Sequence, residues 1–157
     1  MLAPARTLAL LLPLALMAGA LGSQYAGGLV PCEMCMWQRW PHYAAIVAAA
    51  LAILLRRSAL SLLLTIIAAL LILTSGGIGV YHAGAEYGWW QGPEHCTGLV
   101  HGSGADLMRS ILAQPLVRCD VPQWTLVKIS LAGWNALFSI AGGIAVLVLT
   151  LARPRAS

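Results

Sequence analysis

Two pairs of cysteines are the residues of this chain best suited to chemistry. Cys32 and Cys35 are separated by two residues, and Arg39 follows where a long apolar run begins. If the chain is helical from Cys35 onward, Cys35 and Arg39 lie at positions i and i+4 and share one face of the helix. A guanidinium beside a sulfur at a helix N-terminus favours the thiolate over the thiol. The spacing therefore predicts a reactive thiol pair.

The second pair, Cys96 and Cys119, lies in the long polar segment of the chain, with 22 residues between its members. A structural zinc site usually combines two close pairs, or one close pair with nearby histidines, so we expect no metal at these cysteines. Cys35 is followed by Met36 rather than by a histidine, which removes the c-type haem attachment motif. Two static disulfides remain an alternative, although the small ring closed by a Cys-x-x-Cys pair suits exchange chemistry better. Two dithiols in one chain indicate a relay for electrons.

The composition is that of a protein whose solvent is lipid. The chain has 157 residues, which is enough for one domain, and we expect a single domain over residues 1–157. It is 60% hydrophobic and only 9% charged, against roughly 25% charged residues in an ordinary soluble domain. The net charge of +4 is not gathered into a basic patch interleaved with aromatic residues, so we expect no nucleic-acid partner.

Four apolar segments approach or exceed the roughly 20 residues that a helix needs to cross a bilayer. They cover residues 7–26, 37–55, 59–81 and 126–151. Backbone groups cannot stay unpaired in lipid, so these spans should be helices. Trp37 and Trp40 fit an interfacial belt at the outer end of the second span. We therefore predict an all-α membrane protein, a bundle of four transmembrane helices with a long outer loop.

The first span has an alternative interpretation as a secretory signal peptide. Arg6, the apolar run and the small residues at 18–20 resemble such a signal with its cleavage site. The apolar stretch continues past that site through Leu21 and Tyr25, toward the Cys32 motif. This continuation favours a retained span.

The positions of the charged residues predict the orientation. Five arginines precede the first span, separate the second from the third, or follow the fourth: Arg6, Arg56, Arg57, Arg153 and Arg155. All five acidic residues lie on the opposite side: Glu33, Glu86, Glu94, Asp106 and Asp120. The positive-inside rule then puts both termini and the turn at 56–57 in the cytoplasm. All four cysteines face outward, where disulfides form and persist.

The outer loop, residues 86–124, is too long for a simple connector. Apolar residues at helical spacing predict a short amphipathic helix at residues 105–113, with Ser103 as its cap. Gln114-Pro115 would end it, because the residue before a proline avoids the helical region. Such a helix lies along the membrane surface or packs on the spans as a lid.

Five motifs occur in an order that is specific to one family. They are Pro31-Cys32-x-x-Cys35-x-x-x-Arg39, Tyr81-His82-Ala83-Gly84-x-Glu86, Cys96, Arg118-Cys119-Asp120 and Ala132-Gly133-Trp134-Asn135. On these motifs the chain resembles the disulfide-bond formation protein B (DsbB) family, the quinone-reducing thiol oxidases of bacterial inner membranes. The resemblance covers essentially the whole chain.

The resemblance implies a four-helix bundle that reoxidises a periplasmic thioredoxin-like (DsbA-like) disulfide oxidase and reduces a quinone of the membrane pool, ubiquinone in preference to menaquinone. Cys96 would receive the attack of the partner's thiolate, and Cys119 would relay to Cys32. Cys35 would be the thiolate beside the quinone, with Arg39 polarising the quinone. Exchange needs each pair to approach the next in space.

The remaining polar residues have less specific interpretations. His82 either hydrogen-bonds a quinone carbonyl or is a satisfied histidine at the membrane interface. We expect His42, His95 and His101 to be ordinary interfacial or loop residues and Glu86 to be solvated at the surface. An alternative start for the second span is Pro41 as its first turn, which would leave residues 32–39 partly non-helical.

Two other functions are compatible with the same features. One is a non-enzymatic membrane scaffold, such as an assembly or channel subunit, whose outer loop is stapled by disulfides. The scarcity of charge in the spans argues against an ion path. The other is a quinone-linked oxidase like the vitamin K epoxide reductases, but those carry their membrane-proximal Cys-x-x-Cys late in the chain, whereas here it follows the first span.

Overall fold

The computed structural model describes residues 2–93, 104 and 117–152, which form four long helices and a short hairpin. The helices are α1 (Leu2–Tyr25), α2 (Glu33–Leu54), α3 (Leu60–Glu86) and α5 (Leu131–Leu151), and the hairpin pairs β1 (Thr125–Leu126) with β2 (Ile129–Ser130). Cys96, His95, His101 and the amphipathic helix predicted at 105–113 lie outside the described residues.

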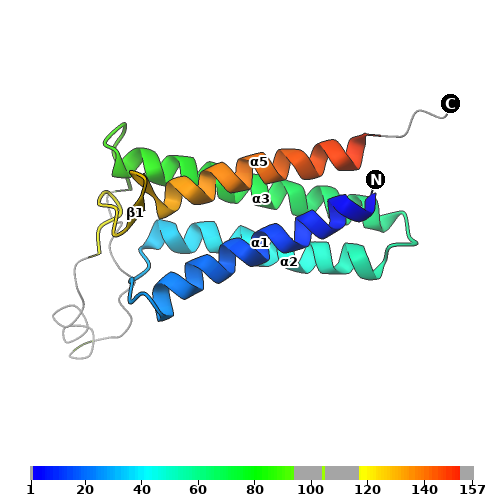
Figure 1. Ribbon diagram of the computed structural model, residues 1–157, viewed down its shortest axis with the longest axis horizontal. Helices are drawn as coiled ribbons and strands as arrows, with labels where there is room; N and C mark the ends of the chain where they lie inside the picture. Colours follow the sequence, from blue (N-terminus) through cyan, green and yellow to red (C-terminus); the bar gives the residue numbers. More distant parts are fainter. Residues whose placement is uncertain (1, 94–103, 105–116, 153–157) are drawn as a thin grey trace.

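The helices lie side by side and alternate in direction along the bundle (Figure 1). The start of α1, the turn between α2 and α3, and the end of α5 lie at one end, while the α1–α2 connection and the hairpin lie at the other. A hydrogen bond of 3.4 Å from Arg6 Nη2 to the carbonyl oxygen of Arg56 joins the start of α1 to the α2–α3 turn. Arg6, near the start of α1, and Arg56, after the end of α2, therefore share one end of the molecule.

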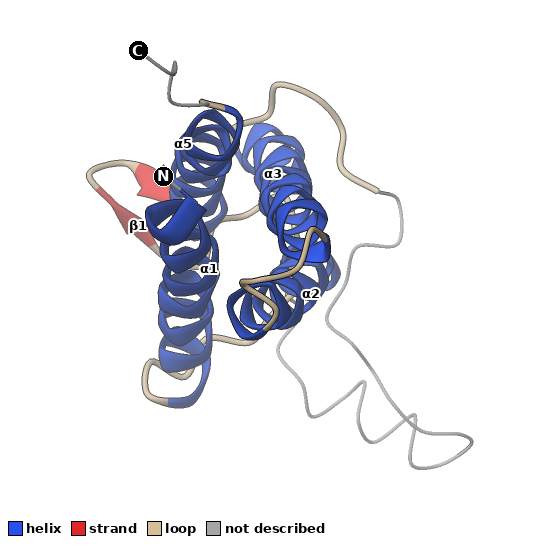
Figure 2. Ribbon diagram, turned by 90° about the vertical axis from the view of Figure 1, so that its right-hand side faces the viewer, coloured by secondary structure: helices blue, strands red, loops and turns tan. Residues whose placement is uncertain are grey.

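Small residues let the helices pack closely. Figure 2, a view along the bundle, shows α3 beside both α2 and α5, and these are its main packing partners. The contact between α2 and α3 contains buried alanines: Ala48 and Ala49 of α2, and Ala68 and Ala69 of α3. At Gly79 of α3 an added Cβ would lie 3.1 Å from the carbonyl oxygen of Ala132 and from the backbone nitrogen of Ala136 in α5. Close backbone approach through small residues is typical of helix packing in membranes.

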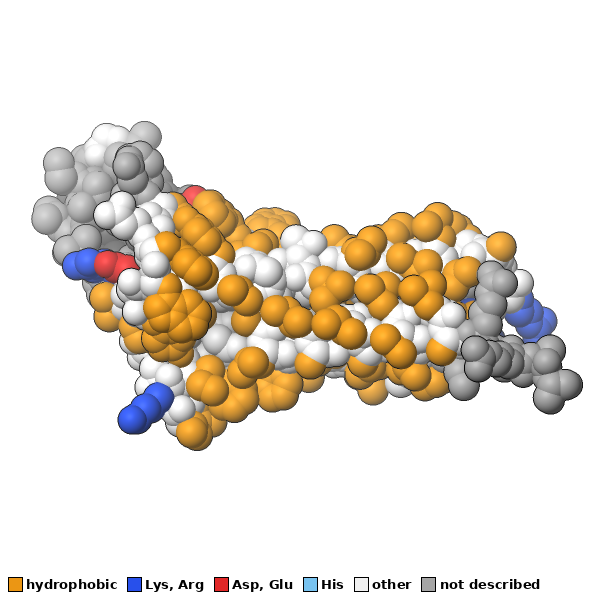
Figure 3. Space-filling view, turned by 90° about the horizontal axis from the view of Figure 1, so that it is seen from above, with side chains coloured by type: hydrophobic (Ala, Val, Ile, Leu, Met, Phe, Trp, Pro, Cys, Tyr) orange, Lys and Arg blue, Asp and Glu red, His pale blue; other side chains and the backbone are white. Residues whose placement is uncertain are grey.

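The outer surface is suited to lipid over the middle of the bundle. α1, α3 and α5 are each long and apolar enough to cross a membrane. α2 is not among these three, and its N-terminal half carries the polar residues Gln38, Arg39 and His42. On the face drawn in Figure 3, hydrophobic side chains cover the middle, and the coloured charges lie toward the two ends.

The helix boundaries correct two expectations. α2 begins at Glu33 and continues through Pro41, so the alternative that Pro41 starts the helix is wrong. α5 begins at Leu131 rather than at 126, because residues 125–130 form the hairpin. Its turn residues Val127 and Lys128 both have positive φ, 52° and 62°. Positive φ at both turn residues is the geometry of a tight two-residue hairpin, and α5 starts only after the second strand has ended.

Candidate functional site

The N-terminus of α2 brings the sulfurs of Cys32 and Cys35 together. Cys32 is the N-cap residue, and its sulfur accepts a hydrogen bond of 3.2 Å from the backbone N–H of Cys35. The two residues are free cysteines, and the thiol of Cys32 donates to the sulfur of Cys35 across 2.9 Å. Cys32 is buried, and Cys35 is half-buried. The hydrogen bond with Cys35, followed by burial, raises the pKa of the Cys32 thiol. The proton of the pair therefore stays on Cys32, which leaves Cys35 as the sulfur with thiolate character.

Cys119 lies against this pair although it is far away in the sequence. It is buried and disulfide-bonded. Its sulfur, the sulfur of Cys32 and a ring nitrogen of His82 all lie within 4.8 Å of one another. Three such atoms could in principle hold a metal ion, but a disulfide sulfur is not the thiolate that a metal prefers. The proximity suits thiol–disulfide exchange between Cys119 and Cys32 instead.

Next to Cys119, Arg118 and Asp120 form an exposed ion pair. Arg118 Nε donates to Asp120 Oδ1 across 2.8 Å, and a second bond joins Nη2 to Oδ2. The hydrogen bond from Arg118 lowers the pKa of the Asp120 carboxyl. Both groups are solvent-exposed, so the pair adds little stability. Its two-point geometry does restrain the backbone on either side of Cys119.

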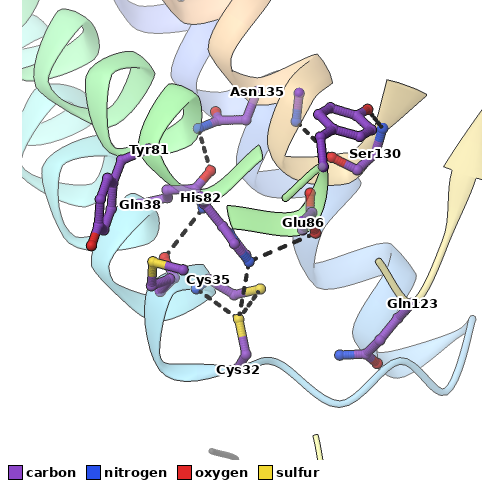
Figure 4. A network of polar contacts seen from close by, with 12 residues as sticks. Cys32, Cys35, Gln38, Tyr81, His82, Glu86, Gln123, Ser130 and Asn135 are labelled. Atoms are coloured by element: carbon purple, nitrogen blue, oxygen red, sulfur yellow. Dashed lines mark hydrogen bonds and ion pairs between the residues drawn. The ribbon is translucent and has the colours of Figure 1, made fainter. Parts of the chain in front are cut away.

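His82 and Glu86 lie one helical turn apart on the face of α3 that looks toward the thiols (Figure 4). His82 Nε2 lies 3.6 Å from the sulfur of Cys32 and 3.7 Å from Glu86 Oε1. The side chain of Glu86 is only 7% exposed, and its Oε2 is buried without a hydrogen-bond partner within the described part of the chain. The expectation that Glu86 is solvated at the surface is therefore wrong.

Arg39 is buried between α2 and α1. Its Nη1 donates to Gln24 Oε1 across 2.5 Å, and its Nη2 donates to the carbonyl oxygen of Ala20 across 3.3 Å. Both partners lie on α1, so the guanidinium is held against α1, one turn of α2 beyond Cys35. Arg39 and Cys35 line the same cavity, as their shared helix face predicts.

A buried polar network that the sequence did not predict lies behind His82. Figure 4 shows Gln38 of α2 between His82 of α3 and Asn135 of α5. Gln38 Nε2 lies 2.8 Å from His82 Nδ1, and Gln38 Oε1 lies 2.8 Å from Asn135 Nδ2. Asn135 Oδ1 in turn lies 2.9 Å from His42 Nε2. His42 is only 2% exposed, so the expectation that it is an ordinary interfacial residue is also wrong.

Two members of the network, His82 and Asn135, belong to the sequence motifs given above. Asn135 belongs to the Ala132-Gly133-Trp134-Asn135 motif, and Gln38 directly precedes Arg39. Helical periodicity does not tell which polar side chains point into the bundle, because lipid-facing positions are as apolar as a core.

One cavity of about 220 Å³ connects these groups. Apolar side chains from α1, α5 and the segment before the hairpin form most of its wall, including Leu16, Met17, Trp124, Trp134 and Phe138. Its polar and reactive lining consists of Ser23, Cys32, Cys35, Gln38, Arg39, His42, His82, Glu86 and Asn135, together with Arg118 and Gln123. An apolar cavity with a few convergent polar groups is the usual form of a small-molecule site.

The tryptophans of the outer end have different roles. Trp90 lies over Gly84, where an added Cβ would come within 2.0 Å of the indole, and its Nε1 donates to the carbonyl oxygen of Tyr81 across 2.8 Å. Trp134 stacks on Phe138. Trp89 is 68% exposed, as a membrane-interface anchor would be. The packing of Trp90 explains why a glycine stands between His82 and Glu86.

The helical bundle, the thiol pair and the adjoining disulfide-bonded cysteine define a membrane protein of thiol–disulfide chemistry. The chain belongs to the family described as "Disulfide bond formation protein DsbB", which matches residues 3–149. As a member of this family it is a membrane oxidoreductase that acts on thiols, and the resemblance found from the motifs is confirmed.

Two curated relatives agree with this assignment. The chain is 33% identical to "Disulfide bond formation protein B" of Polaromonas sp. (strain JS666) over 97% of its own length and 95% of the relative's. It is 29% identical to the protein of the same name from Paracidovorax citrulli, over 98% and 90% of the two chains. No solved structure matches the chain.

Proposed function

We propose that this protein oxidises the dithiol of a periplasmic thioredoxin-like (DsbA-like) disulfide oxidase and passes two electrons to a membrane quinone. The observation that carries the proposal is the row of sulfurs. The sulfur of Cys119 lies within 4.8 Å of that of Cys32, which lies 2.9 Å from that of Cys35 at the wall of an apolar cavity. Electrons entering at the outer loop can therefore reach the cavity by exchange between neighbouring sulfurs.

The relay has four exchange steps. The partner's thiolate attacks Cys96 in the loop disulfide and expels Cys119 as a thiolate. Cys119 then attacks Cys32 in the Cys32–Cys35 disulfide, forming a Cys119–Cys32 bond and expelling Cys35. The second thiol of the partner releases Cys96, and Cys96 attacks Cys119, which restores the loop disulfide and releases Cys32. Each step forms one disulfide bond and breaks one.

The residues that line the cavity fit a quinone. A quinone, when bound, takes up the two electrons of the Cys32–Cys35 dithiol together with two protons. Arg39 supplies a fixed positive charge for a carbonyl oxygen, and Cys35 is the accessible sulfur of the pair. Glu86 and His82 supply polar atoms on the α3 side of the same cavity. That the quinone is ubiquinone rather than menaquinone stays a prediction, which mass analysis of the quinone extracted from the purified protein tests.

We further propose that the chain is a single domain that crosses a bacterial inner membrane four times, with both termini in the cytoplasm and all cysteines in the periplasm. The shared end of Arg6 and Arg56 supports this orientation under the positive-inside rule. Glu33, Glu86 and Asp120 lie toward the opposite end, with the thiols. α2 is the least apolar of the four helices, and its polar side chains Gln38, Arg39 and His42 are buried, away from lipid.

A coupled assay distinguishes this function from a stapled scaffold. The purified protein in detergent is mixed with a reduced thioredoxin-like protein and an oxidised ubiquinone analogue. We expect loss of the partner's thiols together with bleaching of the quinone, and neither change with the Cys35→Ser variant. A scaffold would give neither change with the unaltered protein. Oxidation of small-molecule dithiols alone, with the thioredoxin-like protein left reduced, would favour the activity of the vitamin K epoxide reductase kind.

A further inference from the structure

We propose that Gln38 and Asn135 hold His82 as the neutral tautomer with its proton on Nε2, so that His82 donates a hydrogen bond to the sulfur of Cys32 when that sulfur is released as a thiolate. The role in the reaction rests on the proposed relay. The tautomer itself rests only on the buried network of α2, α3 and α5.

The orientation of the Asn135 amide is fixed by a backbone carbonyl, which can only accept a hydrogen bond, and agrees with the contact to Ser139. Its Nδ2 lies 3.3 Å from the backbone carbonyl oxygen of Ser75, which only accepts. Its Oδ1 accepts a hydrogen bond of 3.1 Å from the hydroxyl of Ser139. Asn135 therefore presents a nitrogen donor to Gln38.

The orientation of the Gln38 amide follows. Gln38 Oε1 accepts from Asn135 Nδ2 across 2.8 Å, and Gln38 Nε2 donates to the carbonyl oxygen of Met34 across 3.2 Å. Turning the amide over would set its oxygen against the Met34 carbonyl and its NH₂ against the NH₂ of Asn135. Both contacts would be repulsive, and Gln38 is only 7% exposed, so water cannot relieve them.

The Gln38 amide determines where the proton of His82 lies. Gln38 Nε2 lies 2.8 Å from His82 Nδ1 and can only donate a hydrogen bond, so Nδ1 must be the unprotonated acceptor. The proton of the neutral ring is then on Nε2. A doubly protonated ring would set an N–H on Nδ1 against the NH₂ of Gln38. His82 is therefore not a base that could take up a thiol proton.

The Nε2–H of His82 faces the sulfurs. Its neighbours are the sulfur of Cys32 at 3.6 Å from α2 and Oε1 of Glu86 at 3.7 Å from its own helix. The sulfur of Cys119, from the segment before the hairpin, lies within 4.8 Å of a ring nitrogen of His82. Each neighbour of His82 Nε2 is either a hydrogen-bond acceptor or a sulfur that becomes negatively charged in the relay. A hydrogen-bond donor at Nε2 is therefore suited to all of them.

The hydrogen bond from His82 assists one step of the relay, the release of Cys32 from its mixed disulfide with Cys119. A thiolate at Cys96 attacks the sulfur of Cys119, the Cys96–Cys119 bond forms, and the Cys119–Cys32 bond breaks. The electron pair of that bond leaves on Cys32, so the negative charge moves from the attacking sulfur to a buried one. Two hydrogen-bond donors stabilise the negative charge on the sulfur of Cys32, the Nε2–H of His82 and the backbone N–H of Cys35. Gln38 is thus a positioning residue that acts through His82.

Nitrogen-15 spectra of the histidine rings test the tautomer directly. The full-length, reduced protein is labelled on its histidines in detergent, and the His82 signals are assigned by their loss in His82→Phe. In the unaltered protein at neutral pH we expect an unprotonated Nδ1 and a protonated Nε2. In Gln38→Glu the carboxylate can only accept, so the Nδ1 signal should move into the protonated range. The matched control Gln91→Glu makes the same change at an exposed glutamine and should leave His82 unaltered.

Two results would overturn the inference: a protonated Nδ1 on His82 of the unaltered protein, or an unprotonated Nδ1 that persists in Gln38→Glu. The first can be read even if the variant does not fold. Neither measurement needs a quinone or a partner protein, so failure of the proposed relay in the coupled assay would leave the tautomer result intact, and the reverse also holds.

Discussion

At the scale of single residues, the proposed relay gives Arg39 a role in quinone use and none in thiol exchange. Its guanidinium is held by two oxygens of α1 and lines the cavity, whereas the sulfurs of Cys32 and Cys119 meet on the α3 side, next to His82. Exchange between the loop disulfide and Cys32 therefore needs no group on Arg39. The proposed binding of a quinone at the cavity does need the charge of Arg39.

Arg39→Ala should weaken quinone use and leave thiol exchange at Cys119 in place. Loss of one hydrogen bond to a charged group in a partly desolvated site costs ~1.5–3 kcal/mol, or about one to two decades in apparent quinone affinity. Steady-state kinetics with varied quinone measure the change. Arg57→Ala, at the exposed turn beyond α2, is the matched control and should leave the kinetics unaltered. Unchanged quinone kinetics in Arg39→Ala would remove Arg39 from the site.

The two cysteines of the outer loop should differ in how they trap a partner. In the proposed relay, attack on Cys96 expels Cys119, which can then return to Cys96 or continue to Cys32. Cys119→Ala removes both exits, so Cys96 should hold a partner that lacks its own resolving cysteine in a lasting mixed disulfide. Non-reducing gels show the adduct, and Cys96→Ala should give none. An adduct with Cys96→Ala and none with Cys119→Ala would reverse the direction of the relay.

Residue types and spacing predicted the thiol pair, its helix and the common face of Cys35 and Arg39, because these depend on local geometry. They did not predict that Glu86 and His42 are buried. In lipid both the core and the outer surface of a bundle are apolar. The helical pattern therefore does not show whether a polar side chain points into the bundle or away from it. The assignments of Cys96 and Cys119 to their steps likewise stay predictions.

At the scale of the elements, the close packing of α3 on α5 positions His82 and Asn135 on the same network. The helices approach at Gly79, where a Cβ would come within 3.1 Å of α5 backbone atoms, and at Gly76, where it would come within 2.8 Å of the Ile140 side chain. Backbone atoms cannot move aside as a flexible side chain can. Larger residues at Gly79 must therefore separate the helices.

Gly79→Leu should lower the free energy of unfolding by about 1–3 kcal/mol, which is the usual cost of overpacking. It should also reduce the rate of quinone reduction, because Asn135 would move away from Gln38. Denaturation in detergent micelles measures the stability. Gly77→Leu is the control on the same helix, since a Cβ at Gly77 has no neighbour within 4 Å. Equal stability of the two variants would show that the glycine at 79 has no packing role.

The hairpin was the element that sequence reasoning missed. Tight two-residue hairpins usually carry Asn-Gly or Asp-Gly, because both turn residues need positive φ. Here Val127 and Lys128 occupy those positions, and Val127 would otherwise extend an apolar run into the fourth span. Tyr87 supports the unusual turn, since its hydroxyl donates to the carbonyl oxygen of Lys128 and accepts from the backbone N–H of Ser130.

At the scale of the whole molecule, the arrangement of the helices links the positions of the two ends: the side of the membrane on which one end lies fixes the side of the other. The start of α1 and the α2–α3 turn share one end, and the described thiols share the other. Evidence for either end therefore decides both.

A membrane-impermeant maleimide, applied to intact reduced cells, should label the native cysteines from outside. A cysteine introduced by Arg57→Cys in a background without native cysteines should stay protected until the membrane is permeabilised. Labelling at position 57 from the outside would invert the proposed topology.

In the proposed function the Cys32–Cys35 pair delivers its two electrons to a quinone. The most direct measurement uses the Cys96→Ser, Cys119→Ser double variant, reduced and mixed with an oxidised ubiquinone analogue without oxygen. We expect one quinone to be bleached per protein, together with a new disulfide between Cys32 and Cys35 found by peptide mass analysis. A quinone that stays oxidised while both thiols remain free would contradict the account.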